Sequence, residues 1–109
     1  MVDVPEHWHL KQSNGFYVHL HMTQDANNNL SGYAYVYDNA NANIVGGHVD
    51  GNKLEFTIDW GPSTRGFYSG TVGSTSTRGS TYDIYHPESQ ASWYSRDFVL
   101  PPKEPDPWL

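Results

Sequence analysis

The side chains best suited to bind a small molecule are aromatic rings that recur in alternating segments along the chain. Indole and phenol rings stack on flat apolar molecules, and neighbouring hydroxyl or amide groups supply hydrogen bonds. We therefore expect a cavity for a hydrophobic or aromatic molecule, with packing of the same rings as an ordinary core as the alternative. The residues predicted to line this cavity are Trp8, Gln12, Trp60, Tyr68, Tyr82 and Trp93.

Small residues on the predicted inner faces favour a cavity over a filled core. Gly32, Ala34, Gly47 and Gly70 have little or no side chain, so they leave space that a larger residue would fill. The sequence contains no phosphate-cradling glycine loop and no other cofactor motif. We therefore predict a ligand site that uses no cofactor.

Four histidines form a second candidate site on two segments predicted to pair. The expected register places His7 opposite His21 and His9 opposite His19. Imidazoles at cross-strand spacing can chelate Zn²⁺, Ni²⁺ or Cu²⁺. No carboxylate or cysteine obviously completes the set, so we predict solvated or interface histidines without a metal and keep chelation as the alternative.

Acid–base catalysis is a third possibility, with candidate groups on Glu55, Asp59, Asp83, His86 and Asp97. Alternation predicts that the first three carboxylates point outward, and it places Asp97 on the face of Trp93 near a barrel mouth. The sequence has no Ser-His-Asp spacing, nucleophile elbow or HExxH motif. A cofactor-free isomerase or cyclase is an alternative function, because such an enzyme needs only a positioned and desolvated substrate.

A fourth feature is a set of aromatic residues predicted to point outward. They are Tyr33, Tyr35, Tyr37, Phe67 and Tyr85. An exposed aromatic band of this kind is typical of an interface between protein chains. A carbohydrate-binding module is a further alternative, because aromatic faces also stack on sugars.

The elements that must position these residues are strands, and the clearest runs over residues 54–60. Apolar and polar side chains alternate there with a period of two, which predicts a strand with one dry face. A two-residue turn at Gly51-Asn52 would place Val49 opposite Leu54 and Val45 opposite Ile58. The hairpin would then have all its apolar residues on one side.

Similar reasoning divides the rest of the chain. Strands are predicted at residues 6–12, 16–23, 30–38, 66–72, 80–86 and 91–99, with loops at 39–43 and 73–79. A three-residue loop at 13–15 gives the first hairpin a clean apolar face, and Tyr82 with Ile84 marks the inner face of the strand at 80–86. Eight short strands with hairpin-type links favour a closed up-and-down antiparallel barrel over a sandwich.

The bulk properties agree with an all-β domain over residues 1–100 and an extended, Pro-rich tail over 101–109. The 109 residues include no cysteine, and the net charge is −6. No basic cluster is present, which argues against nucleic acid or an anionic membrane as a partner. The N-terminal segment lacks the apolar stretch of a signal peptide, so we expect a cytoplasmic protein.

The order of these motifs resembles that of avidin-type barrels within the lipocalin-like superfold. The resemblance covers residues 7–98 and rests on Trp8 with the loop at 13–15, on Leu30-Ser31-Gly32-Tyr33, on Phe56-Thr57-Ile58-Asp59-Trp60, on Phe67-Tyr68-Ser69-Gly70, and on Ala91-Ser92-Trp93 with Phe98. It implies the same barrel and assembly into homodimers or homotetramers.

Two of the three polar biotin-binding residues of that family do not carry over to this chain. The family's first-strand asparagine falls on Leu10, its loop serine near Ser13 or Asn14, and its third-strand tyrosine on Ala34. Because biotin's ureido oxygen needs converging polar donors, the resemblance implies a different ligand. We also expect Trp108 and Leu109, at the end of the tail, either to plug a barrel mouth or to be disordered.

Overall fold

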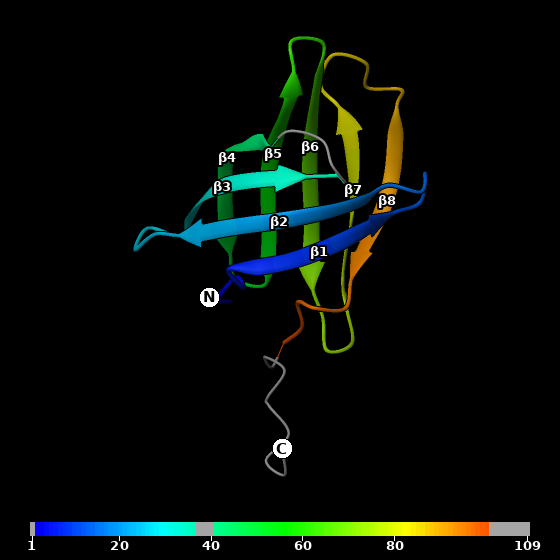
Figure 1. Cartoon of the computed structure of the whole chain (residues 1–109). Helices are drawn as coiled ribbons and strands as arrows, with labels where there is room; N and C mark the ends of the chain where they lie inside the picture. Colours follow the sequence, from blue (N-terminus) through cyan, green and yellow to red (C-terminus); the bar gives the residue numbers. More distant parts are fainter. Residues whose placement is uncertain (1, 37–40, 101–109) are drawn as a thin grey trace.

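A computed structural model describes residues 2–36 and 41–100, which form eight strands and a closed antiparallel barrel (Figure 1). Each strand pairs with the next one in the chain, and the last pairs with the first, which confirms the predicted up-and-down barrel. None of these residues belongs to a helix long and apolar enough to cross a bilayer. The strands are β1 (His7–Gln12), β2 (Tyr17–Gln24), β3 (Asn29–Tyr35), β4 (Ala42–Asp50), β5 (Lys53–Gly61), β6 (Thr64–Val72), β7 (Thr77–Asp83) and β8 (Gln90–Ser95).

The first hairpin has the predicted register. Trp8 pairs with Leu20 and Leu10 with Val18, so the apolar residues of β1 and β2 share the inner face. The same register places His7 opposite His21 and His9 opposite His19 on the outer face. Alternation of side chains along two strands was therefore sufficient to fix this pairing.

The β4–β5 hairpin keeps the predicted turn but contains a bulge. Val49 pairs with Leu54 as expected, whereas Ile44, not Val45, pairs with Ile58. The register shifts between Val45 and His48, where Gly46 has a φ of +66°. The extra residue turns Val45 outward and leaves it exposed, so its predicted place opposite Ile58 is wrong.

β4 begins earlier in the chain than predicted. Ala42 and Asn43 belong to β4, where they pair with Ala34 and Tyr33, although the sequence placed them in a loop. The inner face of β3 carries Leu30 and Ala34, and the tyrosines lie on its outer face. Tyr37 and residues 101–109, which include Trp108 and Leu109, lie outside the described residues.

β7 begins earlier than predicted and turns its other face inward. Thr77 and Thr81 are buried in the barrel, whereas Tyr82 and Ile84 are exposed. The apolar residues suggested the opposite orientation, which is wrong because Thr81 pairs with the inward Tyr68 across the β6–β7 ladder. β8 ends at Ser95 and not near residue 99, since the chain bends away beyond it.

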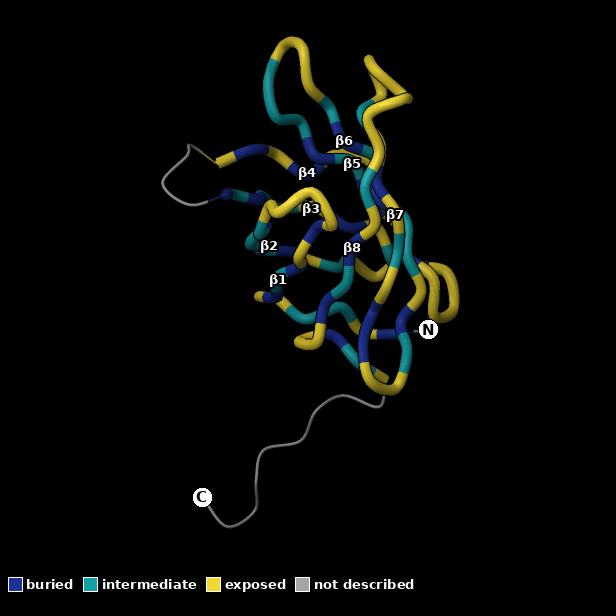
Figure 2. The backbone as a smooth tube through the Cα atoms, turned by 90° about the vertical axis from the view of Figure 1, so that its right-hand side faces the viewer, coloured by how far each residue is buried: buried dark blue, intermediate teal, exposed yellow. Residues whose placement is uncertain are grey.

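A column of aromatic rings fills one half of the barrel. Tyr68 stacks on Phe56 with ring centroids 5.0 Å apart, and Phe56 meets Trp8 edge to face at 6.1 Å. Trp8 also contacts Phe98 at 5.3 Å and Trp93 at 6.1 Å. Buried and exposed positions alternate along the strands (Figure 2). This half of the barrel is a packed core.

Segments outside the strands close the packed end. The Val2 amide donates to the Gly51 carbonyl at 3.0 Å, and the Gln24 side chain holds Val2 and Val4 through hydrogen bonds of 3.1 and 2.8 Å. Phe98, which is 1% exposed, enters the core from the other side. The barrel is therefore covered at this end.

The seam between β1 and β8 is the shortest ladder among the described strands. Its register pairs are Lys11 with Tyr94 and Gln12 with Trp93. Further along, the His9 amide donates to the Asp97 carboxylate at 3.1 Å, and the same carboxylate contacts the His9 ring. A side chain thus continues the closure where the backbone ladder stops.

A candidate ligand cavity at the open end of the barrel

The half of the barrel that the aromatic column does not fill contains a cavity of about 270 Å³. It lies beside the β5–β6 and β7–β8 connections, which project at the top of the view in Figure 1. Strands β1, β2, β5, β6, β7 and β8 contribute to its wall. The lining residues are Gln12, Asn14, Phe16, Val18, Val36, Trp60, Thr64, Gly66, Tyr68, Thr81, Tyr82, Asp83, Ser89, Gln90 and Ala91.

Polar side chains meet where the cavity reaches the aromatic column. The Tyr68 hydroxyl donates to Gln12 Oε1 at 2.5 Å, and Gln12 Nε2 donates to Asn14 Oδ1 at 3.0 Å. Burial raises the pKa of the Tyr68 hydroxyl to about 12, and hydrogen bonds from Thr81 and Trp60 offset only part of this increase. Tyr68 is therefore a neutral hydrogen-bond donor at physiological pH, and its phenolate is not available as a base.

Other residues of the wall are apolar. Val18 and Val36 are buried beside the cavity, and the half-buried Trp60 packs against the core while one side lines the cavity. Phe16, at the β1–β2 turn, is 51% exposed and forms part of the rim. A site with apolar walls and a small polar cluster at its base is suited to a small, partly aromatic molecule.

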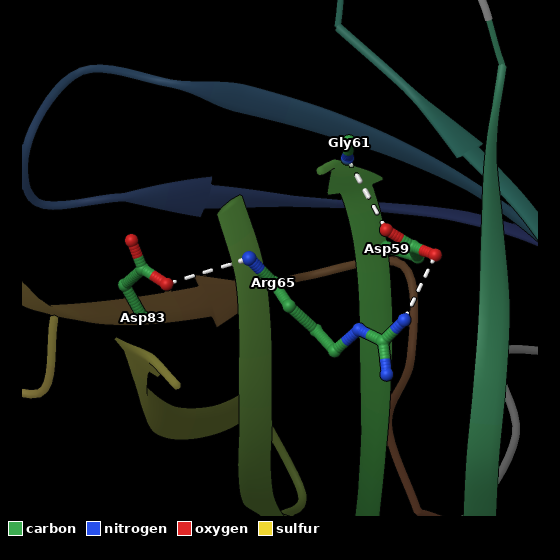
Figure 3. A network of polar contacts seen from close by, with 4 residues as sticks. All are labelled: Asp59, Gly61, Arg65 and Asp83. Carbon is green, nitrogen blue, oxygen red and sulfur yellow. Dashed lines mark hydrogen bonds and ion pairs between the residues drawn. The ribbon is translucent and has the colours of Figure 1, made fainter. Parts of the chain in front are cut away.

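One carboxylate lines the rim, and its hydrogen bonds anchor the adjacent loop. Burial disfavours the charged form of Asp83, but hydrogen bonds from the Tyr85 amide, His86 and the Arg65 amide outweigh it and lower the pKa of Asp83. Figure 3 shows the hydrogen bond from the Arg65 amide to Asp83 beside the Arg65–Asp59 ion pair of 3.0 Å. Asp83 is ionised at neutral pH and ties β6 to the β7–β8 connection.

The structure brings four of the six predicted site residues to this cavity. Gln12, Trp60 and Tyr68 line its wall, and Tyr82 lines its mouth from the outer face, where it packs on Phe67 at 5.5 Å. Trp8 and Trp93 do not line it. Trp8 donates to Met22 Sδ at 3.3 Å, and Trp93 donates to the Ser80 carbonyl at 3.0 Å, so both indoles are anchored in the packed half.

Neighbouring side chains fill the space beside two of the small residues that were expected to leave room for a ligand. A Cβ at Gly70 would lie 2.6 Å from the Trp93 ring, and one at Gly47 would lie 2.6 Å from Leu30 Cβ. Gly32 serves another purpose, since a Cβ there would lie 1.9 Å from the His21 carbonyl oxygen. These glycines allow close packing, so the predicted use of Gly47 and Gly70 as cavity space is wrong.

The predicted acid–base groups do not converge. Glu55 is exposed on the outer face, as expected, and Asp59 pairs with Arg65. Asp97 lies beside His9 and not at the cavity, whereas Asp83, predicted to point outward, lines it. His86 contacts Asp83 at 3.2 Å and remains exposed.

The predicted aromatic band is divided into separate groups. Tyr33 and Tyr35 stack on His21 and His19, each with centroids 4.8 Å apart, whereas Phe67 packs on Tyr82. β4 and β5 lie between the two groups in the barrel. A single continuous band is therefore wrong for the residues that the structure describes.

Sequence reasoning missed several lining residues for identifiable reasons. Val18 and Val36 have the same parity as their inward neighbours, so alternation could have placed them in the wall. Thr81 and Asp83 were missed because β7 has polar residues on its inner face. The prediction had assigned the inner face to the positions of the apolar residues.

Comparisons of the chain with known protein families, with curated proteins and with solved structures found no match. The geometry of the barrel and of its cavity is therefore the basis for the functional argument.

Proposed function

We propose that this protein binds an uncharged or cationic small molecule with an aromatic or apolar body in the open-end cavity. The observation that carries the proposal is the arrangement of the wall, with Val18, Val36 and Trp60 beside a polar cluster of Tyr68 and Gln12. The apolar part would stack on Trp60. A carbonyl or hydroxyl of the ligand would hydrogen-bond to Gln12 or Tyr68.

Charge and volume support this choice of ligand. Among the described lining residues only Asp83 carries a charge at neutral pH, so an anion would meet repulsion and no cationic partner. A cavity of about 150 Å³ engineered in another protein holds benzene. The 270 Å³ found in this barrel suits a two-ring molecule or a substituted single ring.

Two buried positions argue against biotin as the ligand, even if the chain is related to avidin-type barrels. Leu10 and Ala34, where the resemblance implies biotin-contacting polar residues, are 0% exposed and part of the core. A polar ligand atom would find no donor at either side chain. The binding mode we propose therefore relies on Gln12 and Tyr68.

Calorimetric titration with indole, and with indole-3-carboxylate as its anionic counterpart, tests the proposal. We expect indole to bind and the carboxylate to bind at least about tenfold more weakly, a difference of about 1.4 kcal/mol. Trp60→Ala should abolish indole binding because it removes the stacking surface, while the circular dichroism spectrum of the barrel is retained.

Tyr85→Phe is the matched control, because Tyr85 is exposed, does not line the cavity and loses only one hydroxyl. Its affinity for indole should stay within about twofold of the original, a change below about 0.5 kcal/mol. Equal affinity of the original protein and Trp60→Ala, or preference for the carboxylate, would contradict the proposal. Native mass spectrometry of protein isolated from its own host would identify the natural ligand and the number of subunits together.

A further inference from the structure

The outer face of the barrel carries rows of rings that take no part in the cavity. One row crosses β1, β2 and β3 through His7, His21 and Tyr33, and the next crosses the same strands through His9, His19 and Tyr35. Glu6 precedes β1, and its carboxylate lies beside His21 of the first row. Two imidazoles and a carboxylate therefore meet on one exposed surface.

We propose that Glu6, His7 and His21 form a binding site for a divalent transition-metal ion such as Zn²⁺. Their possible ligand atoms all lie within 4.8 Å of one another, and His21 Nε2 lies 3.7 Å from Glu6 Oε1. A tetrahedral ion with bonds of about 2.0–2.1 Å holds its ligand atoms about 3.3 Å apart. The three side chains thus need only small rotations to reach this spacing.

The backbone holds the three residues in this arrangement. His7 and His21 are directly opposed, and their rings meet edge to face with centroids 4.1 Å apart. The Met22 amide donates to the Glu6 carbonyl at 2.8 Å, so Glu6 is fixed beside the end of β2 although it precedes β1. The side chains of Glu6 and His21 are 71% and 30% exposed, which leaves both free to adjust and accessible to an ion.

Tyr33 supports the site from behind. Its hydroxyl lies 3.2 Å from His21 Nδ1, and its ring stacks on the imidazole at 4.8 Å. A histidine that binds a metal through Nε2 carries its proton on Nδ1, and that proton is usually donated to a neighbouring oxygen. The Tyr33 oxygen is in place to accept it, so the orientation of His21 suits binding through Nε2.

The donor set selects the kind of ion. Two imidazole nitrogens and one carboxylate oxygen favour Zn²⁺, Cu²⁺ or Ni²⁺ over Ca²⁺ and Mg²⁺, which prefer sets of oxygen ligands. Three protein ligands leave a fourth position for water or another molecule. The second row is not equivalent, because its rings are 6.0 Å apart and His9 contacts Asp97.

Calorimetric titration with ZnCl₂ tests the site, on protein that carries no affinity tag. We expect one ion per chain in the original protein. Affinity should fall at least about 100-fold in His7→Ala and in His21→Ala, since losing a ligand exceeds the 10–100-fold effect of losing an outer partner. His19→Ala, on the same face in the second row, is the matched control and should stay within about twofold.

A second readout separates ligation from a general effect of surface charge. Tyr33→Phe leaves the charge and the ligands unchanged and should weaken binding about tenfold. Co²⁺ should give the visible bands of a four-coordinate ion with the original protein and lose them with His21→Ala. The proposal is overturned if neither Zn²⁺, Ni²⁺ nor Cu²⁺ binds, if His21→Ala binds as tightly as the original, or if His19→Ala loses binding equally.

Discussion

The Tyr68 hydroxyl links the packed half of the barrel to the hollow half. Its ring belongs to the aromatic column, where it stacks on Phe56, while its oxygen reaches Gln12 at the base of the cavity. Because burial raises its pKa to about 12, it donates a hydrogen bond over the whole physiological range. Because its single proton is directed to Gln12, the Tyr68 oxygen would be a constant acceptor for a ligand that donates a hydrogen bond at this position.

The pKa of Tyr68 predicts a loss of stability at high pH. The unfolded chain releases the tyrosine proton near pH 10, and the folded protein only near 12, so the free energy of unfolding should fall as pH rises from 10 to 12. Ionisation of this residue should lower the free energy of unfolding by about 2–3 kcal/mol at pH 12. Urea unfolding of the original protein and Tyr68→Phe should show the variant losing less stability over this interval.

Tyr68→Phe should also be less stable than the original by about 1 kcal/mol at pH 7, because Gln12 Oε1 loses its donor. An identical decrease with pH in both proteins would show that Tyr68 ionises like an exposed phenol.

A second residue-scale prediction concerns Gly79. A Cβ at this position would lie 1.8 Å from the Ser69 carbonyl oxygen and 2.7 Å from the Trp93 ring. Gly79→Ala should therefore destabilise the barrel by about 3 kcal/mol, because a backbone strand or a buried indole must move. Ser80→Ala, at an exposed neighbouring position, should change the free energy of unfolding by less than about 0.5 kcal/mol. Equal stabilities of the two variants in thermal unfolding would contradict this account.

At the scale of elements, the bulge in β4 decides which side chains face the core. Gly46 adopts a left-handed conformation, and the register of β4 against β5 shifts by one residue around it. This shift turns Ile44 inward in place of Val45. A residue without a Cβ is favoured at such a position.

Gly46→Ala should therefore cost about 1 kcal/mol in the free energy of unfolding, since a Cβ disfavours this backbone conformation. No heavy atom lies within 4 Å of the position that the Cβ would occupy, so the cost comes from the backbone and not from a clash. Gly46→Asn should cost less, because asparagine adopts positive φ more readily. Chemical unfolding measures both, and a more stable alanine variant would refute the explanation.

The sequence predicted elements well where alternation was complete and poorly where the chain departs from it. The first hairpin and the β4–β5 turn follow from alternating apolar residues. The bulge at Gly46 was not predictable from alternation, because one inserted residue changes parity without changing composition. The inner face of β7 was misassigned because threonines and Gly79 face the core, where the large rings of Tyr68 and Trp93 need the space.

At the scale of the whole molecule, the interior is divided into a packed end and a hollow end. Trp8 and Trp93 belong to the first and Trp60 to the second, although the three indoles are equivalent in the sequence. Which indole becomes core depends on contacts across the barrel, such as those of Trp8 with Phe56 and Phe98. Such contacts join residues far apart in the chain, so local patterns could not separate ligand-facing rings from packed ones.

The proposed metal site makes a prediction about the stability of the entire barrel. An ion held by Glu6, His7 and His21 would join the start of β1 to the second half of β2. At a Zn²⁺ concentration of 100 times Kd, the linkage adds about 2.7 kcal/mol, equivalent to about 10 °C in Tm for a domain of this size. Binding to histidines of the unfolded chain would reduce this value. Scanning calorimetry should show the increase for the original protein and its absence for His21→Ala.

The short ladder between β1 and β8 has a consequence for how molecules enter and leave. Backbone amides along this seam should exchange with deuterium faster than those of the β5–β6 ladder. The reason is that fewer hydrogen bonds must break for the barrel to open locally between β1 and β8. Gln12 and Trp93 form one of the two register pairs of the seam, with Ser13 hydrogen-bonded to Ser92 beyond them, and Gln12 also lines the cavity. Transient parting of these two strands would widen the route to the hollow end, so the seam would set the residence time of a bound molecule.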